Sequence, residues 1–350
     1  MLHFFWNGYI PSQRSYSVYE YSNTEIAKWA EYYLGQRIPF HQSLMAAGRV
    51  TVHPDDILLG HPSWDNRSIQ EQQEMGSLLY DWVRDNALSS EAVCHPNTFI
   101  LMPWVPQFPA EWLDRMPHLE AQLRVAKKIF ALCGSIWIER TFSARDDSIQ
   151  YEVRNKLVRC HMGCAAQNFA IVKEKFNPIG ERQILHVSNL SSYKGFPITC
   201  ESLIGLDTLL HVASSMPKGA QGLVEYRSEI GSLWFNFLGS IKNSDPEFNH
   251  WVAQTCDFYI HTATMDAQAT TILENCARGL VPLVTPESGF SSDYAIYLTH
   301  DPEKNKSIIQ QALDMPENEL RERSIFVRKQ IVEEHNWQKI YQQIGDEILC

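Results

Sequence analysis

Two carboxylates with seven residues between them, Asp266 and Glu274, flank the start of a predicted helix. An apolar run, Phe258 to His261, leads into a polar loop, Thr262 to Gln268, and the helix follows the loop. The free backbone N–H groups and the dipole of a helix N-terminus favour an anion. A pyrophosphate bound there would have a carboxylate on each side, and both could accept hydrogen bonds from hydroxyl groups. This layout suits a sugar, a diphosphate and a ribose in a row.

The elements that must position these carboxylates form a βαβ unit. The helix carries apolar residues from Ile272 to Ala277, and Gly279 ends it. The β-rich run Leu280 to Thr285 comes directly afterwards. Strand, loop, helix, glycine stop and buried strand are typical of a parallel α/β sheet.

The segment that starts at Asp266 resembles the signature of the retaining GT-B glycosyltransferases. In that family a glutamate, seven residues and a second glutamate precede an A-x-G-x-P-V run and a small-residue loop. Glu274 takes the place of the second glutamate, Ala277 to Pro282 follows in step, and Ser288-Gly289 replaces the usual glycine pair. Asp266 stands where the first glutamate is expected, so a carboxylate is kept. The glycines that usually follow it are replaced by alanines 267 and 269.

A second match to the same family lies upstream, at Gln183 to Pro197. It reads as a strand, a polar turn, and Lys194-Gly195 opening the next helix. The family pattern V-G-R-L-x-x-x-K-G uses its Arg and its Lys to hold the donor diphosphate. Lys194 fits, but Asn189 occupies the Arg position. Because an amide donates hydrogen bonds without charge, we expect a lower phosphate affinity.

The resemblance implies a role for each of these residues. Glu274 would hold the ribose hydroxyls, Asp266 the sugar hydroxyls, and Lys194 the diphosphate. The nucleotide base would lie at the loop that begins with Gly239. The donor-binding residues expected in this way are Asn189, Gly195, Gly239, Ser240, Ala269, Thr270, Ser288 and Gly289.

Candidate acceptor contacts follow the predicted strands of the N-terminal half. They are Asn7-Gly8-Tyr9, His61 and Trp104. Loops after the carboxyl ends of strands line the ligand crevice in doubly wound sheets. Each has a structural alternative: a plain turn for Asn7 to Tyr9, a half-buried histidine bonded to a loop carbonyl for His61, and a packed aromatic for Trp104.

The sequence predicts chemistry without a metal ion or a protein nucleophile. Cys160, His161 and Cys164 are spaced closely enough to suggest a metal site, but no second ligand pair accompanies them. No Asp-x-Asp pair stands at a strand end. We therefore expect no metal, and no cofactor other than the nucleotide-sugar donor. Catalysis would depend on stabilising the leaving group and on positioning.

The charge and the apolar content of the sequence limit the classes of partner that we expect. The net charge of −11 argues against nucleic acid, because phosphate binding needs a basic field. Residues 1–168 carry 15 Lys+Arg and 18 Asp+Glu, a net of −3, so peripheral membrane contact is not favoured. No apolar run reaches the roughly 18 to 20 residues that span a bilayer, and the N-terminus lacks the features of a signal peptide. We expect a cytoplasmic protein with reduced cysteines, acting on a glycan, a small molecule or a lipid-linked acceptor.

The fold class expected is α/β, of the GT-B type, with two Rossmann-like, doubly wound parallel-sheet domains facing a central cleft. Residues 1–168 would form the acceptor-side domain, 169–182 a linker and 183–334 the nucleotide-sugar domain. A final helix within 335–350 would cross back to the first domain.

Several element predictions are specific enough to be checked. Ser22 and Glu25 read as a capping box for a helix that ends near Gly35. Arg145 to Tyr151 reads as a charged loop, and Pro197 to Ser214 as one helix. Further helices are expected at 246–254, 302–313, 317–334 and 337–349.

Three functions remain open at this point. The first is a retaining, metal-independent glycosyltransferase. The second is a degenerate relative that binds a sugar nucleotide or a protein partner without turnover, which the changes at Asn189, Asp266 and the missing glycines favour. The third is a sugar-nucleotide epimerase on the same fold, which uses a different arrangement of carboxylate and histidine. Turnover of a donor distinguishes the first from the second.

Overall fold

The structure is a computed structural model that describes residues 1–5, 17–43, 51–60, 95–102, 122–143, 148–166, 169, 171–188, 190, 192–214, 235–241 and 245–350. The chain divides into two compact units. Unit 1 is formed mainly by Ser22–Met162 together with Trp337–Cys350, and unit 2 mainly by Gly163–Asn336. Each unit contains its own parallel sheet of six strands among the described residues.

The sheet of unit 1 has the strand order β2-β1-β3-β4-β5-β6, and all its pairings are parallel. Parallel strands covered on both faces read as short apolar runs, and these strands are buried accordingly. The order reverses between β1 and β3, whose ends lie side by side, with Phe5 opposite Gly60. The strands are β1 (Leu2–Phe5), β2 (Phe40–Ser43), β3 (Ile57–Gly60), β4 (Thr98–Met102), β5 (Lys128–Leu132) and β6 (Leu157–Cys160).

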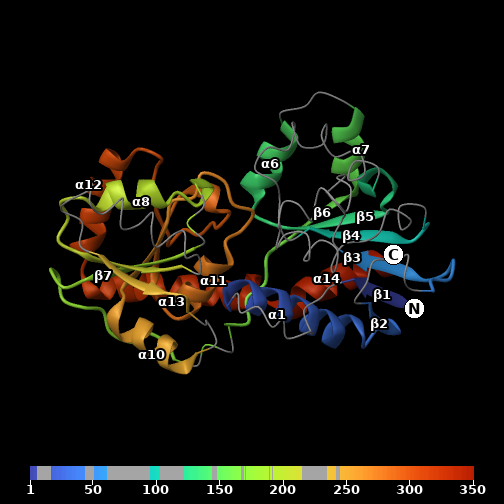
Figure 1. The fold of residues 1–350 in the computed structure, drawn as a ribbon, viewed down its shortest axis with the longest axis horizontal. Helices are drawn as coiled ribbons and strands as arrows, with labels where there is room; N and C mark the ends of the chain where they lie inside the picture. Colours follow the sequence, from blue (N-terminus) through green and yellow to red (C-terminus); the bar gives the residue numbers. More distant parts are fainter. Residues whose placement is uncertain are drawn as a thin grey trace, which may run out of the picture. The chain divides into compact units, whose positions relative to one another are not determined.

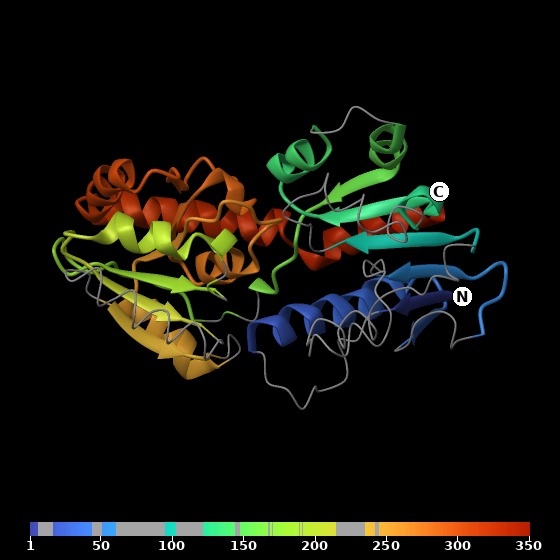
Figure 2. The same cartoon turned by 45° about the horizontal axis from the view of Figure 1, so that its top comes forward.

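Helices cover both faces of this sheet. Figures 1 and 2 show α1 (Ser17–Leu34) and α14 (Trp337–Leu349) over one face, and α6 (Ser135–Ser143) and α7 (Ser148–Lys156) over the other. The last helix of the chain packs against the first, since the hydroxyl of Tyr341 donates to the carbonyl of Ile26 at 2.6 Å. The first and last helices therefore belong to the same hydrophobic layer.

The sheet of unit 2 has the strand order β12-β11-β10-β7-β8-β9 and is again parallel throughout. The chain runs outward from β7 through β8 to β9, then returns to β10 on the other side of β7. The point between β7 and β10 is therefore the topological switch point, where open α/β sheets bind ligands. The strands are β7 (Gln183–Val187), β8 (Leu209–Ala213), β9 (Phe235–Gly239), β10 (Phe258–His261), β11 (Val281–Val284) and β12 (Ile296–Tyr297).

The helices of unit 2 lie on both faces of its sheet. Figure 1 shows α8 (Phe196–Leu203) and α12 (Pro302–Leu313) together over one face and α10 (Pro246–Thr255) over the other. The helix α11 (Thr270–Ala277), which joins β10 to β11, packs against α13 (Glu317–Glu334). Opposite directions of travel from the switch point, with right-handed crossovers, require helices on opposite faces.

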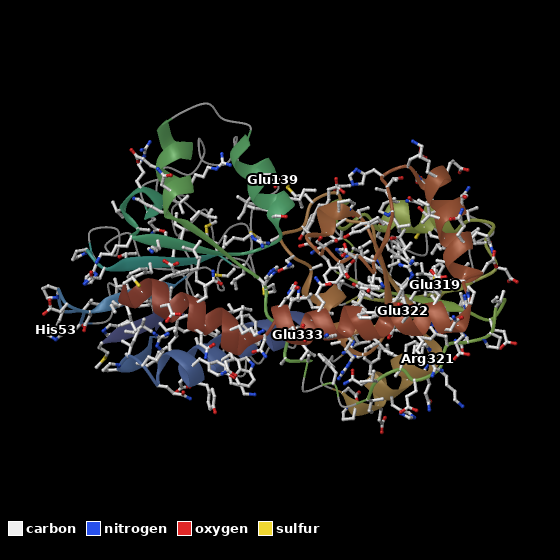
Figure 3. The ribbon with its side chains drawn as sticks, turned by 180° about the vertical axis from the view of Figure 1, so that it is seen from behind. His53, Glu139, Glu319, Arg321, Glu322 and Glu333 are labelled. Carbon is white, nitrogen blue, oxygen red and sulfur yellow. The ribbon has the colours of Figure 1, made fainter. Side chains whose placement is uncertain are left out.

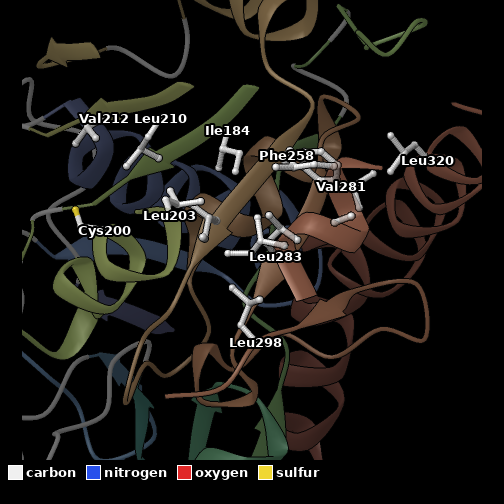
Figure 4. Close-up of a cluster of buried hydrophobic side chains, with 14 of the residues drawn as sticks. Ile184, Cys200, Leu203, Leu210, Val212, Phe258, Val281, Leu283, Leu298 and Leu320 are labelled. Carbon is white, nitrogen blue, oxygen red and sulfur yellow. The ribbon is translucent and has the colours of Figure 1, made fainter. Parts of the chain in front are cut away.

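The core of unit 2 lies between the sheet and α8 and α12 (Figure 4). Leu283, Phe258 and Leu210 from three different strands are fully buried in it. Each such side chain contributes about 1.5–3 kcal/mol relative to an exposed one. This packing fixes the strands from which the site loops emerge.

The segment expected to be a linker is packed into unit 2. Lys173 and Asp257 form a fully buried ion pair at 3.1 Å. Asn177 donates its backbone N–H and its side-chain amide to the same carboxylate, so the buried charge is well satisfied. Arg182 donates to the carbonyls of Ala312 and Leu313 at the end of α12, where helix carbonyls lack partners within the helix.

Three of the element predictions are wrong in part. The helix α1 begins at Ser17, so Ser22 lies within it and does not cap it. The helix α7 occupies most of the segment expected as a charged loop. The expected helix from Pro197 ends as α8 at Leu203, and the chain then turns at Gly205, with φ +84°, before β8. A left-handed glycine is a common helix stop, and the apolar run after it forms a buried strand.

The outer face of α13 carries alternating charges. Figure 3 labels Glu319, Arg321, Glu322 and Glu333 along this helix. Arg321 pairs with Glu317 at 3.0 Å, and Arg323 pairs with Glu319 at 3.1 Å. Such i,i+4 pairs stabilise a solvent-facing helix by a few tenths of a kcal/mol each. This pattern is that of an exposed structural helix.

Candidate functional site

The candidate site lies at the switch point of unit 2, where the loops after β7 and β10 emerge. Lys194 comes from the loop after β7, in a short 3₁₀ turn, Ser192–Lys194, before α8. Asp266 comes from the loop between β10 and α11. Although 71 residues separate them in the sequence, β7 and β10 are neighbours in the sheet. The fold therefore brings the two charged side chains together.

A short ion pair joins these residues. The Nζ of Lys194 lies 2.5 Å from Oδ2 of Asp266. The Nε2 of His261 lies 3.1 Å from the same Oδ2. No described residue hydrogen-bonds the other oxygen, Oδ1. One oxygen of the carboxylate is thus held by two donors, and the other is left to accept.

Burial and charge act in opposite directions on this cluster. Burial alone would raise the pKa of Asp266, but the ammonium of Lys194 and the hydrogen bond from His261 outweigh it and lower the pKa to about 2. Burial lowers the pKa of His261, so its ring is neutral near pH 7. The site therefore contains an ionised carboxylate, an ammonium and a neutral imidazole.

The close approach of two loops requires glycine at position 195. Gly195 has φ +71°, and an added Cβ would lie 1.8 Å from the carbonyl oxygen of Thr262. The hydroxyl of Thr262 donates to the Gly195 carbonyl at 2.6 Å. The hydroxyl of Thr199 lies 2.8 Å from the hydroxyl of Thr262. These contacts fix the start of α8, and with it Lys194, against the loop after β10.

A third loop, after β11, closes on the carboxylate loop. The N–H of Asp266 donates to the carbonyl of Glu287 at 2.8 Å, and the N–H of Ala269 donates to the carbonyl of Ser288 at 3.1 Å. Gly289, with φ +76°, approaches Ala267 so closely that an added Cβ would lie 2.2 Å from its carbonyl oxygen. The expected pair Ser288-Gly289 therefore supports the carboxylate loop through its backbone.

The helix α11 begins directly after this loop. Thr270 is its first residue, and the preceding Ala269 provides no side-chain cap. The amide of Ala269 is already bonded to Ser288, which corrects the expectation that it would be open to a diphosphate. Glu274 lies one turn further along and is only 3% exposed. The start of the helix thus leaves the amide of Thr270 without a capping side chain.

A buried histidine, His186, orders the loop after β7. Its Nδ1 lies 3.0 Å from the carbonyl of Ile260, and its Nε2 lies 2.9 Å from the hydroxyl of Ser188. A carbonyl only accepts, so Nδ1 carries the proton and Nε2 accepts from Ser188. The same hydroxyl accepts from the N–H of Leu190, which has φ +57°. This chain of hydrogen bonds holds an uncommon backbone conformation at the site.

The remaining expected donor contacts lie at the end of β9, as expected, or outside the described residues. Gly239, with φ +72°, ends β9, and its carbonyl accepts from the N–H of Ser214. Ser240 follows it and is exposed. Asn189 is not among the described residues. The acceptor-side predictions also lie outside them: Asn7, Gly8, Tyr9, His61 and Trp104.

Within the part of the chain that the structure describes, no group of three or more His, Cys, Asp or Glu could hold a metal ion. The thiol of Cys160 ends β6 and points to the carbonyl of Val158, and burial raises its pKa to about 12. A buried thiol with a raised pKa is typical of a structural cysteine.

A hollow of about 450 Å³ lies elsewhere, along α13. It is lined by Glu317, Asn318, Arg321, Glu322, Ile325 and Phe326, all from that one helix. Its main charges already pair with each other along the helix. We therefore assign the site to the switch point, where side chains from separate elements converge.

His186 and His261 are site residues that the sequence motifs do not predict. His186 lies inside an apolar run and His261 ends one, and both positions are typical of buried strands. A histidine at the last position of a predicted strand, five residues before the expected carboxylate, is the signal that could have identified His261.

The comparisons with known proteins show the fold. No protein-family model matches the sequence, and the search of curated proteins found no match. Solved structures do match. WaaG, a glycosyltransferase involved in lipopolysaccharide biosynthesis, is 15% identical with a TM-score of 0.59, and the match covers 99% of both chains. Anabaena HepE, solved in complex with UDP and glucose, is 12% identical with a TM-score of 0.62, over 99% of this chain and 98% of HepE.

TarM from S. aureus, solved as a variant with Fondaparinux, α-GlcNAc-glycerol and UDP, is 9% identical with a TM-score of 0.59. The match covers 93% of this chain but only 59% of TarM. At these identities the likeness shows a shared architecture, the GT-B fold of two Rossmann-like units, as expected from the sequence. None of the helices in the described residues is long and apolar enough to cross a membrane.

Proposed function

We propose that this chain, which has the GT-B fold, is a glycosyltransferase that moves a sugar from a nucleotide-diphosphate sugar to an acceptor. The transfer would retain the anomeric configuration and need no metal ion or further cofactor. The observation that carries the proposal is the meeting of Lys194 and Asp266 at the switch point of unit 2. An ammonium is suited to a leaving diphosphate, and a carboxylate beside it is suited to the hydroxyls of the departing sugar.

The surrounding residues fit this assignment. The amide of Thr270 at the start of α11 adds a donor for the diphosphate, and Glu274 would accept from the ribose hydroxyls. Asn189 would assist with a neutral hydrogen bond. Charged hydrogen bonds contribute about 1.5–3 kcal/mol and neutral ones about 1 kcal/mol, so Lys194 would provide most of the leaving-group stabilisation.

The acceptor would be bound by unit 1. Asn7 to Tyr9 and His61 follow β1 and β3, the pair of strands between which the order of that sheet reverses. Trp104 follows β4. Because open α/β sheets bind ligands at a switch point, we expect the acceptor contacts in these loops. A glycan, a small molecule and a lipid-linked sugar are the acceptor classes to test.

Turnover of a donor panel tests the proposal. The purified chain is incubated with nucleotide sugars of all bases, beginning with UDP-glucose because HepE was solved with UDP and glucose. Release of nucleoside diphosphate is measured with and without EDTA, and the anomer of the product is determined by NMR. We expect release that survives EDTA and a product with the donor's configuration. Strict dependence on a divalent cation, or an inverted product, would contradict the mechanism.

A second candidate is a protein of the same fold that binds a sugar nucleotide without turning it over. The ion pair favours it, because Lys194 is already neutralised by Asp266 before any donor arrives. Saturable binding of a nucleotide sugar without release of nucleoside diphosphate, in the presence of acceptor extracts, would support this candidate over the enzyme.

A further inference from the structure

The neutral ring of His261 is fixed in place behind the site carboxylate. It is fully buried at the end of β10. It stacks on His186 of β7, with ring centroids 6.1 Å apart, and on Tyr259 of its own strand at 6.3 Å. The hydroxyl of Tyr259 in turn bonds the carbonyl of Val187 at 3.0 Å. The ring is therefore packed against two other rings where it contacts Asp266.

The hydrogen-bond partners define the tautomer of His261. An ionised carboxylate only accepts, so Nε2 carries the proton that points to Oδ2 of Asp266. Since burial keeps the ring neutral, Nδ1 is unprotonated. Among the described residues Nδ1 has no hydrogen-bond partner. In the described structure the only hydrogen bond of this ring is the one that it donates to Asp266, and its buried Nδ1, which has no partner, carries a desolvation penalty.

The carboxylate is held asymmetrically as a result. Lys194 and His261 both donate to Oδ2, and Oδ1 receives no hydrogen bond from the described residues. Aspartate has only two side-chain torsions, so fixing one oxygen fixes the other. A neutral donor adds this constraint without a second positive charge, and the carboxylate therefore keeps its strength as an acceptor.

We propose that His261 is a positioning residue that holds Oδ2 of Asp266 and thereby presents Oδ1 to a hydroxyl of the transferred sugar. This inference rests on the proposed function for its substrate, and on the geometry of the ligand-free site for the rest. The groups that face the cluster are Lys194 from the turn before α8, His186 from β7 and Tyr259 from β10. Of these, Lys194 alone also lowers the pKa of Asp266.

Two variants separate the hydrogen bond from the packing. In His261→Gln the side-chain amide takes the place of the ring Nε2–H and still donates to Asp266. His261→Leu keeps an apolar side chain but removes the donor, and His261→Asn, whose amide is one methylene too short, replaces it if the leucine variant does not fold. The control is His211→Leu, which removes another buried histidine of the same sheet. His211 bonds the side chain of Gln183 rather than a site residue.

The first measurement needs no substrate. The pKa of Asp266 is followed by carboxyl ¹³C NMR in selectively labelled protein, with Asp266→Asn to assign the signal. We expect the pKa of Asp266 to rise clearly in His261→Leu and to stay near the wild-type value in His261→Gln and His211→Leu. An unchanged pKa in His261→Leu would overturn the proposal, whether or not the protein is a transferase.

The second measurement concerns turnover. For the donor that the panel identifies, kcat/KM should fall about 10- to 100-fold in His261→Leu, as for the loss of one hydrogen bond to a charged group. The acid limb of the pH–rate profile should move to higher pH. His261→Gln should recover most of both effects. Equal loss in both variants, with the wild-type pH profile, would make His261 a packing residue and overturn the proposal. If the wild type binds and turns over no nucleotide sugar, the proposed function fails, and the NMR titration still decides the positioning role.

Discussion

Buried histidines lie at and beside the switch point of unit 2. His186 is buried entirely and hydrogen-bonded through both nitrogens. Burial, with the neighbouring His261, lowers the pKa of His186 to about 3, and burial lowers that of His211 on β8 to about 4. These rings are neutral in the folded protein at any physiological pH.

Acid pH should therefore destabilise the protein before its carboxylates titrate. A free histidine titrates near pH 6.5, so below that pH the unfolded chain binds protons that the folded chain does not. The stabilisation is complete above pH 6.5 and is lost as the pH falls towards 3. Each buried histidine should remove up to about 1.4 kcal/mol of unfolding free energy per pH unit in this window.

The test is urea unfolding at several pH values between 7.5 and 4.5. In His186→Phe, which keeps an aromatic ring, the slope of unfolding free energy against pH should fall by about 1.4 kcal/mol per pH unit. The absolute stability also changes through lost hydrogen bonds, so the slope is the quantity compared. An identical slope in the wild type and the variant would mean that His186 is protonated in the folded protein.

The sequence predicts some residues of this site and not others. Lys194 was identifiable from the short motif that follows β7, and Asp266 and Glu274 from their spacing within the βαβ unit that starts at β10. The hydrogen bonds of His186 and His261 were not, because they depend on the pairing of β7 with β10, two strands about 70 residues apart in the sequence. A histidine inside an apolar run reads as part of the strand, and only the neighbouring strand determines what it bonds.

Secondary-structure elements meet at this site through close backbone contacts. Gly195 and Gly205 both have positive φ, at either end of α8. An added Cβ at Gly195 would collide with the carbonyl of Thr262, whereas at Gly205 it would meet nothing within 4 Å. Comparing an alanine substitution at Gly195 with one at Gly205 therefore distinguishes the effect of backbone strain from the effect of crowding.

We predict that Gly205→Ala destabilises by about 1–2 kcal/mol, the strain of a left-handed alanine. Gly195→Ala should destabilise the protein by about 1–3 kcal/mol more than Gly205→Ala does, because the loop after β10 must move away. It should also abolish nucleotide binding, since Lys194 adjoins the displaced residue. Both free energies are measured by denaturant unfolding, and equal values for the two variants would contradict the assigned contact between the loops.

Most elements followed from local pattern. The predicted bounds of β10, α12, α13 and α14 agree with the structure. Local signals mark several of these bounds, such as the capping residue Asp301 before α12 and the regularly spaced buried residues of α14. The segment from Pro197 to Ser214 reads as one helix because apolar residues continue through it. The break at Gly205 and the parallel partner of β8 made the end of this segment a strand. In α7 the charged composition concealed a helix whose apolar residues are few.

The whole molecule is two parallel-sheet units, and the final helix α14 belongs to unit 1 although the segment before it belongs to unit 2. Alternation of strands and helices predicted this class from the sequence. The extent of the linker was harder to predict, because the burial of Lys173 and Arg182 depends on partners much later in the chain, namely Asp257 just before β10 and the end of α12.

The central claim is that the switch point of unit 2 binds a nucleotide-diphosphate sugar through Lys194 and Glu274. Isothermal titration calorimetry with nucleoside diphosphates and their sugars tests it most directly. We expect saturable binding at one site in the wild type, at least about tenfold weaker in Lys194→Ala and Glu274→Gln. Lys304→Ala, which removes an exposed lysine of the same unit, should bind as the wild type does. No binding by any nucleotide, or equal affinity in all four proteins, would contradict the account.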